Sequence, residues 1–481
     1  MTTFVGRYRE LNQLRDLFDC RVASLVIVKG RRRIGKSRLI EEFAKEAKFV
    51  SISGLAPTKG VTSKHQREEF AKQMSRIFQV PTPSHTNWSD LFWFLAEQTK
   101  RSKVVILLDE ISWMGSKDAT FLGKLKNAWD LYFKKNSKLI LVLCGSVSSW
   151  IEKNILSSTN FVGRIDLTLT LGELSLPECN EFWKKETGKL STYEKFKILG
   201  VTGGVPRYLE IISPKYNAEE NIKRLFFIKE GFLFNEFDKI FNDLFVKNNQ
   251  IYKDIILCLT KKPHAELDDI FKFLNMTKSG GVIKYLENLI TSGFIKRDYT
   301  WSIRNDKQSK FSCFRISDNY FRFYFKYVLP NKSKIESDAF VNRSLTMLPG
   351  WDTIMGLQFE NLVLHNRRLV QELLHIDPNE IVHDNPYFQK ATSFKKGCQI
   401  DYMIQTRYNS LYICEIKFSK KPIQSNVISE IKNKISYLDL PKNFSYRPVL
   451  IHVNGVDDDV IASEYFSNIV DFGDLLDIRG D

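Results

Sequence analysis

The run from Gly30 to Ser37 constrains this chain more than any other segment. It reads Gly-Arg-Arg-Arg-Ile-Gly-Lys-Ser and fits the pattern G-x-x-x-x-G-K-[ST], between an apolar strand-like run at 25–29 and an amphipathic stretch at 37–47. Glycines let the backbone curl so that its N–H groups face phosphate oxygens, while the lysine reaches the terminal phosphates and the serine hydroxyl binds Mg²⁺. A plain strand-to-helix turn is the alternative, and it does not explain this combination. We therefore predict a phosphate-binding loop made of Gly30, Arg31, Arg32, Arg33, Ile34, Gly35, Lys36 and Ser37.

An acidic pair predicts the second half of a nucleotide site. Residues 104–108 are apolar and indicate a buried strand that leads into Asp109 and Glu110. A carboxylate at the end of such a strand holds magnesium, and a second one beside it accepts a proton from water. We therefore expect Asp109 to bind Mg²⁺ with Ser37, and Glu110 to be the general base. The sequence has no N-K-x-D guanine signature, so the pattern favours ATP and its hydrolysis.

Two polar residues later in the chain are weaker candidates for the same site. Ser146 follows the apolar run 139–144, where its hydroxyl would touch the γ-phosphate or the attacking water; a helix N-cap is an equally good interpretation. Arg164 offers an arginine to the phosphates, either of its own chain or of a neighbouring one. A surface salt bridge explains Arg164 equally well.

Up to about residue 172, apolar runs alternate with amphipathic stretches. This alternation indicates an α/β fold, with a parallel sheet covered by helices. The expected strands are 25–29, 49–53, 104–108, 139–144 and 165–171, and the expected helices include 63–78, 90–99 and 120–133.

A winged helix-turn-helix outline follows further along the chain. Three short helical stretches, at 252–259, 266–274 and 279–291, precede strand-like runs at 293–297 and 311–316. Lys284 on the third helix and a basic wing would suit a DNA duplex, although Asp268, Asp269 and Glu287 dilute the positive field. An internal packing or regulatory role is the alternative.

The C-terminal part carries an acid followed by E-x-K. Asp401 lies on one strand-like run, and Glu415 and Lys417 lie two residues apart on the next, so both point to the same face. Two carboxylates can bind Mg²⁺, and a lysine beside them can position water and offset charge on a phosphodiester. Glu360 on the preceding helix would add a carboxylate. An exposed cross-strand Glu–Lys pair is the ordinary alternative.

These patterns divide the 481 residues into four parts: a phosphate-loop core at 1–174, a helical lid and connecting helices at 175–245, the winged helix at 246–330, and an α/β domain at 335–481. A polar linker is expected at 330–334. The net charge of +15 favours a polyanionic partner, and DNA is expected first. A protein partner and self-association remain open. Scattered cysteines and the lack of an apolar leader or bilayer-length run predict a cytoplasmic protein without a membrane partner.

Several of these motifs together resemble the archaeal and bacterial P-loop ATPases related to AAA+ and STAND proteins. The resemblance rests on Phe4-Val5-Gly6-Arg7, the loop at 30–37, Leu107-Leu108-Asp109-Glu110, Cys144-Gly145-Ser146 and Gly203-Gly204-Val205-Pro206. It implies that Val5 lies over the adenine, that Ser146 is sensor 1 and that Pro206 belongs to the lid. It also implies the strand order 5-1-4-3-2. Many such ATPases end in a PD-(D/E)xK nuclease core, which the C-terminal part resembles, except that Ile400 precedes the acid where a proline-aspartate pair is usual.

Two functions from different classes follow. The first is an ATP-hydrolysing, DNA-associated protein with a metal-dependent nuclease domain. The second is a STAND-like switch that binds ATP and a protein partner, with an inert C-terminal domain. Metal-dependent DNA cleavage separates the two.

Overall fold

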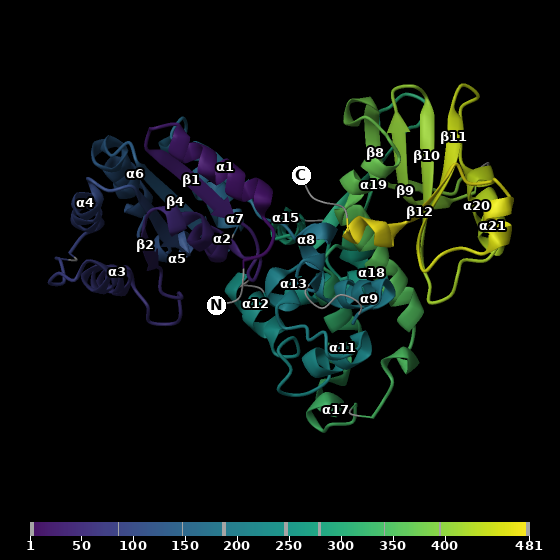
Figure 1. The fold of residues 1–481 in the computed structure, drawn as a ribbon, viewed down its shortest axis with the longest axis horizontal. Coiled ribbons are helices and arrows are strands. Elements are labelled where there is room, and N and C mark those ends of the chain that lie inside the picture. Colours follow the sequence, from purple (N-terminus) through teal and green to yellow (C-terminus); the bar gives the residue numbers. More distant parts are fainter. Residues whose placement is uncertain are drawn as a thin grey trace. The chain divides into compact units, whose positions relative to one another are not determined.

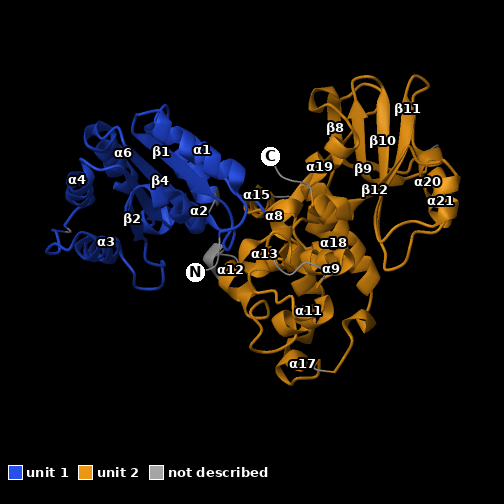
Figure 2. Cartoon of the chain, viewed as in Figure 1, with its two compact units in different colours: residues 1–173 blue, residues 174–481 orange. Residues whose placement is uncertain are grey.

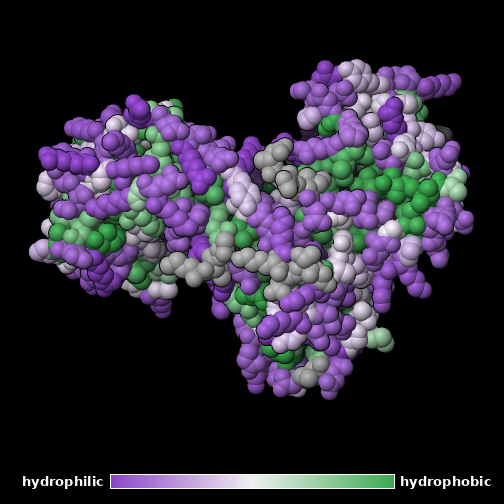
Figure 3. Space-filling model, in the orientation of Figure 1, coloured by the Kyte–Doolittle hydropathy of each residue, from purple (hydrophilic) through white to green (hydrophobic). Residues whose placement is uncertain are grey.

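The computed structural model describes residues 4–84, 86–146, 148–184, 189–244, 249–277, 280–340, 342–393 and 396–477. The chain forms two compact units, Met1–Glu173 and Leu174–Asp481 (Figure 2). The first unit therefore ends one residue from the expected end of the phosphate-loop core. In the view of Figure 3 most of the surface is hydrophilic, and apolar side chains gather in limited areas. Within the described ranges, no helix combines the length and apolar character needed to cross a bilayer.

The first unit is built on a parallel five-stranded sheet in the order β2-β3-β4-β1-β5, which confirms both the α/β prediction and the expected strand order (Figure 1). Its strands are β1 (Ser24–Lys29), β2 (Lys48–Ser53), β3 (Val104–Asp109), β4 (Leu139–Gly145) and β5 (Leu167–Thr170). Its helices are α1 (Tyr8–Asp19), α2 (Lys36–Phe43), α3 (Ser63–Phe78), α4 (Trp88–Thr99), α5 (Ile111–Met114), α6 (Phe121–Leu131) and α7 (Ser148–Ile151).

Helices cover both faces of this sheet because successive strand residues point to opposite sides. In β1, Val26 and Val28 pack with α1 and α2, whereas Leu25 and Ile27 pack with α3, α4 and α6. The middle strands are buried almost throughout, as expected for a parallel sheet with two covered faces. The edge strand β5 has four residues and is shorter than the expected strand at 165–171.

The second unit begins with helices and ends in a mixed sheet. Its first helices are α8 (Leu176–Asn180), α9 (Thr192–Thr202), α10 (Pro206–Leu209), α11 (Ala218–Phe226), α12 (Glu236–Leu244), α13 (Asn249–Lys261), α14 (Leu267–Phe273) and α15 (Gly280–Thr291). The antiparallel hairpin β6 (Ile295–Trp301) and β7 (Gln308–Ile316) follows them. The expected third short helix lies here as α15, although its predicted first residue, Ser279, is outside the described residues.

After the hairpin come α16 (Asn319–Phe323), α17 (Lys332–Glu336), α18 (Trp351–His365) and α19 (Arg367–Leu373). The expected linker at 330–334 is therefore helical rather than irregular. The C-terminal sheet has the order β12-β11-β10-β9-β8. Its strands are β8 (Ile381–Gln389), β9 (Cys398–Thr406), β10 (Ser410–Phe418), β11 (Ser445–Val453) and β12 (Asn468–Asp471), with α20 (Asn426–Tyr437) and α21 (Asp458–Ala462) between them.

One continuous core joins the helical segment, the hairpin and the C-terminal sheet. Phe196 of α9, Phe359 of α18 and Phe472 after β12 pack as an aromatic cluster with centroid separations of 5.2–5.5 Å. The buried guanidinium of Arg315 on β7 lies 2.6 Å from Asp298 of β6 and also binds Asn361 of α18. The helical segment after residue 174 thus shares its core with the C-terminal part, and the four-part division of the chain stays a prediction.

Candidate functional site

The phosphate loop connects β1 to α2, with Gly35 in a left-handed conformation directly before the helix. Lys36 is buried, and its Nζ donates to the carbonyls of Gly30 and Arg31 at 2.9 and 3.0 Å. A Cβ on Gly30 would lie 2.5 Å from the carbonyl oxygen of Leu171, so only glycine fits there. The lysine ammonium is therefore already placed at the loop carbonyls, where it can exchange them for phosphate oxygens.

The acidic pair lies directly beside this loop. The Ser37 hydroxyl donates to Asp109 Oδ2 at 2.7 Å, although the two residues are 72 positions apart in the sequence. A hydroxyl oxygen beside a carboxylate, with room left for phosphate oxygens and water, is a ligand set that suits Mg²⁺. Ser37 and Asp109 thus fit the metal expected from the sequence.

Glu110 and Ser146 meet at the ends of the neighbouring strands β3 and β4. The Ser146 hydroxyl lies 2.9 and 3.0 Å from the two carboxylate oxygens of Glu110, and Glu110 has a left-handed backbone with φ of 51°. The turn after β3 therefore directs Glu110 toward Ser146. Cys144 is also buried here, and burial, then the charge of Asp109, raises the pKa of its thiol. This cysteine stays protonated.

Arg7 is a residue of this site that the motif analysis did not single out. Its buried guanidinium donates to the carbonyl of Ile34 in the loop, at 3.2 Å, and to that of Gly172 after β5. Arg31 of the loop is paired with Glu173 at 2.9 Å. Val5 lies two residues before Arg7, in the segment that Arg7 attaches to the loop. The signal for Arg7 in the sequence was its place in Phe-Val-Gly-Arg, which was linked only to Val5.

We expect Arg7→Ala to lower the free energy of unfolding of the first unit by about 1–2 kcal/mol, because the buried carbonyl of Ile34 and the partly buried bond to Gly172 lose their donor. Urea unfolding followed by circular dichroism measures the change. Arg9→Ala is the matched control, since Arg9 is exposed on the same segment. Equal stability of the two variants would show that Arg7 does not hold the loop.

The structure places Arg164 in an ion pair on α6. Its Nε and Nη2 donate to the two carboxylate oxygens of Asp130 at 3.0 and 2.9 Å, and Lys126 also contacts Asp130. The hydrogen bond from Arg164 is the largest contribution that lowers the pKa of Asp130 to about 2. This arrangement favours the salt-bridge interpretation, and a phosphate contact by Arg164 stays a prediction.

We expect Arg164→Ala to leave ATP turnover within about twofold and to change stability only slightly near neutral pH, because the pair is partly exposed. The folded pKa of Asp130 lies below its ordinary value of 3.8, so the pair stabilises the fold above pH 4, and this contribution is lost as the pH falls toward 2. Thermal unfolding of both proteins between pH 7 and pH 2 checks this. A turnover loss of about 10³-fold would instead mark Arg164 as a phosphate ligand.

The remaining loop residues lie in the first unit, and the lid residue Pro206 lies in the second. Ile34 is buried in the core beside β1, and Arg32 and Arg33 are partly exposed. Pro206 is the first residue of α10 and belongs to the second unit, so its contribution at the nucleotide stays a prediction.

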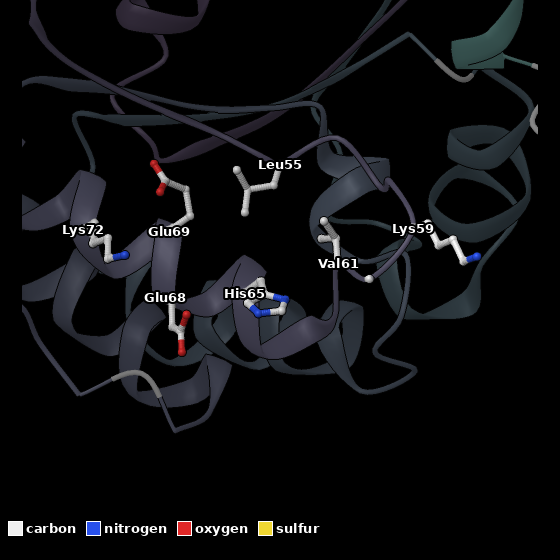
Figure 4. A pocket seen from close by; sticks show the side chains of 8 residues that line it. Leu55, Lys59, Val61, His65, Glu68, Glu69 and Lys72 are labelled. Carbon is white, nitrogen blue, oxygen red and sulfur yellow. The ribbon is translucent and has the colours of Figure 1, made fainter.

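A separate hollow of about 490 Å³ lies between the loop after β2 and α3 (Figure 4). Its charged lining consists of Lys59, Lys72, Glu68 and Glu69, so the charges cancel. His65 also lines it and forms the capping box of α3 with Thr62. Nothing in this lining selects one class of ligand.

In the C-terminal sheet, the structure brings Asp401, Glu415 and Lys417 together. Lys417 Nζ lies 3.0 Å from Glu415 Oε1, and Asp401 Oδ2 accepts the backbone N–H of Ile416 at 3.0 Å. Burial, then the charge of Glu415, raises the pKa of Asp401. Burial, then the charge of Asp401, raises the pKa of Glu360, so Glu360 on α18 also lies within electrostatic reach of the pair.

A second lysine, Lys434 of α20, also reaches these acids. Its Nζ lies 2.6 Å from Glu415 Oε2 and 3.7 Å from Asp401 Oδ1. Lys434 lies outside the acid and E-x-K pattern of the sequence. Across the described part of the chain, no three His, Cys, Asp or Glu side chains gather as a metal-binding group. As they stand, Asp401 and Glu415 are held by ammonium groups and do not fit a divalent ion.

The fold and the phosphate-loop geometry of the first unit are those of the class of P-loop ATPase domains. Residues 4–212 match a family described as an ATPase domain predominantly from Archaea. The chain is 26% identical over 339 residues to an uncharacterized protein of Methanocaldococcus jannaschii. The aligned region covers 70% of this chain and 71% of the relative.

Two solved structures extend the comparison. A Walker-type ATPase of Pyrococcus abyssi is 15% identical with a TM-score of 0.51, covering 67% of this chain and 96% of that chain, and it is similar in fold. The ORC2 protein of Aeropyrum pernix is 12% identical with a TM-score of 0.42, covering 71% of this chain and 98% of that chain.

Proposed function

We propose that this protein binds and hydrolyses ATP at the phosphate loop and acts on DNA through its second unit. The observation that carries the proposal is the convergence of Lys36, Ser37, Asp109, Glu110 and Ser146 at the ends of adjacent strands. An ATPase domain family that matches residues 4–212 supports the first half.

In the proposed reaction, the loop N–H groups and Lys36 bind the phosphates, and Ser37 and Asp109 hold Mg²⁺, which would neutralise phosphate charge. Glu110 accepts the proton of the attacking water. The Ser146 hydroxyl orients the Glu110 carboxylate, since it already bonds to both of its oxygens. We assign Val5 to the adenine and Pro206 to the lid by resemblance only.

Two features support DNA as the partner of the second unit. The helices α13, α14 and α15 and the β6–β7 hairpin follow one another as in a winged helix. Lys284 on α15 and Lys307 and Lys310 at the hairpin are exposed. However, Trp301 of the same hairpin is buried and donates its indole N–H to Gln405 of β9, so the hairpin also packs internally.

A second candidate function is phosphodiester cleavage by the C-terminal domain. The helix α18, the strands β8, β9 and β10, the helix α20 and the parallel strand β11 follow the order of a PD-(D/E)xK core. Lys417 and Glu430 line an open cavity of about 410 Å³ together with Lys421, Gln424 and Asn426. A nucleic-acid backbone suits this lining, whereas the lysines on Glu415 oppose metal binding.

Measuring ATP turnover and the affinity for duplex and branched DNA, at several salt concentrations and with Mg²⁺ or Mn²⁺, tests both halves. We expect ATP hydrolysis and a DNA affinity that falls as salt rises, since phosphate contacts release counterions. ATP binding without salt-dependent DNA affinity would favour the switch with a protein partner. Equal DNA nicking by the wild type, Glu415→Ala and Lys417→Ala would remove the nuclease assignment.

A further inference from the structure

Three of the four carboxylate oxygens of the Asp401–Glu415 pair have a donor within 3.0 Å, and the remaining one faces an ammonium group. Lys434 Nζ contacts Glu415 Oε2 and faces Asp401 Oδ1, at 2.6 and 3.7 Å, and Lys417 Nζ contacts Glu415 Oε1 at 3.0 Å. The other oxygen of Asp401, Oδ2, accepts the backbone N–H of Ile416. Both carboxylates therefore lie beside at least one cationic or N–H group.

The two ammonium groups are fixed in place by the fold. On α20, Val427, Ile431 and Ile435 are buried, so Lys434, next to Ile435 and three residues after Ile431, extends from the side of the helix that packs on the sheet. The Lys434 side chain is 32% exposed, whereas that of Glu415 is 4% exposed. Lys417 is held from its other side by Glu430 of α20, at 2.9 Å.

Two ammonium groups, those of Lys417 and Lys434, face the Asp401–Glu415 pair, while Glu430 contacts Lys417 from its other side and the buried Glu360 lies within electrostatic reach. A divalent ion placed between Asp401 and Glu415 would be repelled by both lysines at short range. Burial lowers the pKa of Lys434, but the charges of Asp401 and Glu415 outweigh it and raise that pKa above its ordinary value. The ammonium therefore remains charged at neutral pH.

We propose that Lys434 is the resident cation of the Asp401–Glu415 pair, so the C-terminal site holds a lysine where a nuclease of this layout would hold a divalent metal. The domain then offers Lys417 and the adjoining cavity to a phosphate backbone without a metal of its own. This inference does not depend on ATP hydrolysis, and metal binding tests it separately from the proposed function.

The experiment is a Mn²⁺ titration of the nucleotide-free full-length chain, followed by electron paramagnetic resonance. The parent carries Asp109→Asn, which removes the carboxylate at the end of β3, beside the phosphate loop, as a second Mn²⁺ ligand. We expect the variant Lys434→Met in this parent to bind one Mn²⁺ per chain at the Asp401–Glu415 pair. Its affinity for Mn²⁺ should be at least about tenfold higher than that of the parent. Adding Asp401→Asn should abolish that site.

Three control variants make the result specific. Lys432→Met removes an exposed lysine of the same helix and should leave Mn²⁺ binding unchanged. Lys417→Met should also create no site, because Lys434 remains between the two carboxylates. Lys434→Arg keeps the positive charge and should exclude Mn²⁺ as the parent does.

A parent chain that binds Mn²⁺ as tightly as Lys434→Met, through a site that Asp401→Asn removes, would overturn the proposal. An equal gain from Lys432→Met would overturn it as well. Thermal unfolding verifies that each variant is folded. Lys434→Gln replaces Lys434→Met where the methionine variant unfolds early, with the same expected gain in Mn²⁺ affinity.

Discussion

Replacing Lys36 by alanine should weaken the binding of ATP with Mg²⁺ by at least about 100-fold, because charge-assisted hydrogen bonds to phosphate contribute about 1.5–3 kcal/mol each. The ammonium of Lys36 is buried and already bound to the carbonyls of Gly30 and Arg31. On binding ATP, this ammonium exchanges the carbonyls for phosphate oxygens. Isothermal titration calorimetry measures the loss.

Lys45→Ala is the matched control for this experiment. Lys45 follows α2, and its side chain is 68% exposed. Its Nζ lies 2.7 Å from Oε1 of Glu42 in α2. ATP affinity should be unchanged in this variant. Unaltered heat of binding in Lys36→Ala, from folded protein, would contradict the assignment of the loop.

Replacing Glu110 by glutamine should slow ATP turnover by roughly 10²–10⁴-fold while ATP still binds, because the amide cannot accept the proton of water. The change keeps the shape of the side chain and one oxygen for the Ser146 hydroxyl, which lies 2.9–3.0 Å away. Phosphate release at saturating ATP measures turnover, and calorimetry measures binding.

Two further variants serve as comparisons for Glu110→Gln. Ser146→Ala should slow turnover less than Glu110→Gln, since it removes only the group that orients the carboxylate. Glu97→Gln changes a surface acid that pairs with Lys100 at 3.2 Å and should leave turnover unchanged. Wild-type turnover in Glu110→Gln would show that another group accepts the proton.

Much of the first unit was accessible from the sequence because its strands and helices have strong periodicity. The five strands and their parallel character were predicted, and their order came from resemblance. In the second unit, β8 was missed because Pro386 interrupts its apolar pattern, and the pairing register shifts between Asn385 and Tyr387. Proline lacks an N–H, so such a strand is tolerated at the sheet edge.

The boundary between α18 and α19 shows the same limit. It lies at Asn366, whose side chain accepts the backbone N–H of Leu176 at 3.1 Å. That contact joins positions 190 residues apart, so the local sequence around Asn366 does not predict it.

The sequence by itself determined the chemistry of the phosphate loop, since the spacing from Gly30 to Ser37 already places backbone N–H groups, a lysine and a hydroxyl at one helix start. Asp109 and Glu110 followed from the end of a buried strand. Only the tertiary structure decided that Arg7 holds the loop and that Lys434 lies between Asp401 and Glu415. Both are single basic residues in segments whose local sequence does not mark them as buried. Arg7 contacts Ile34, 27 positions further along the chain, and Lys434 contacts Glu415, 19 positions earlier, so only the packing of the folded chain brings each residue to its partner.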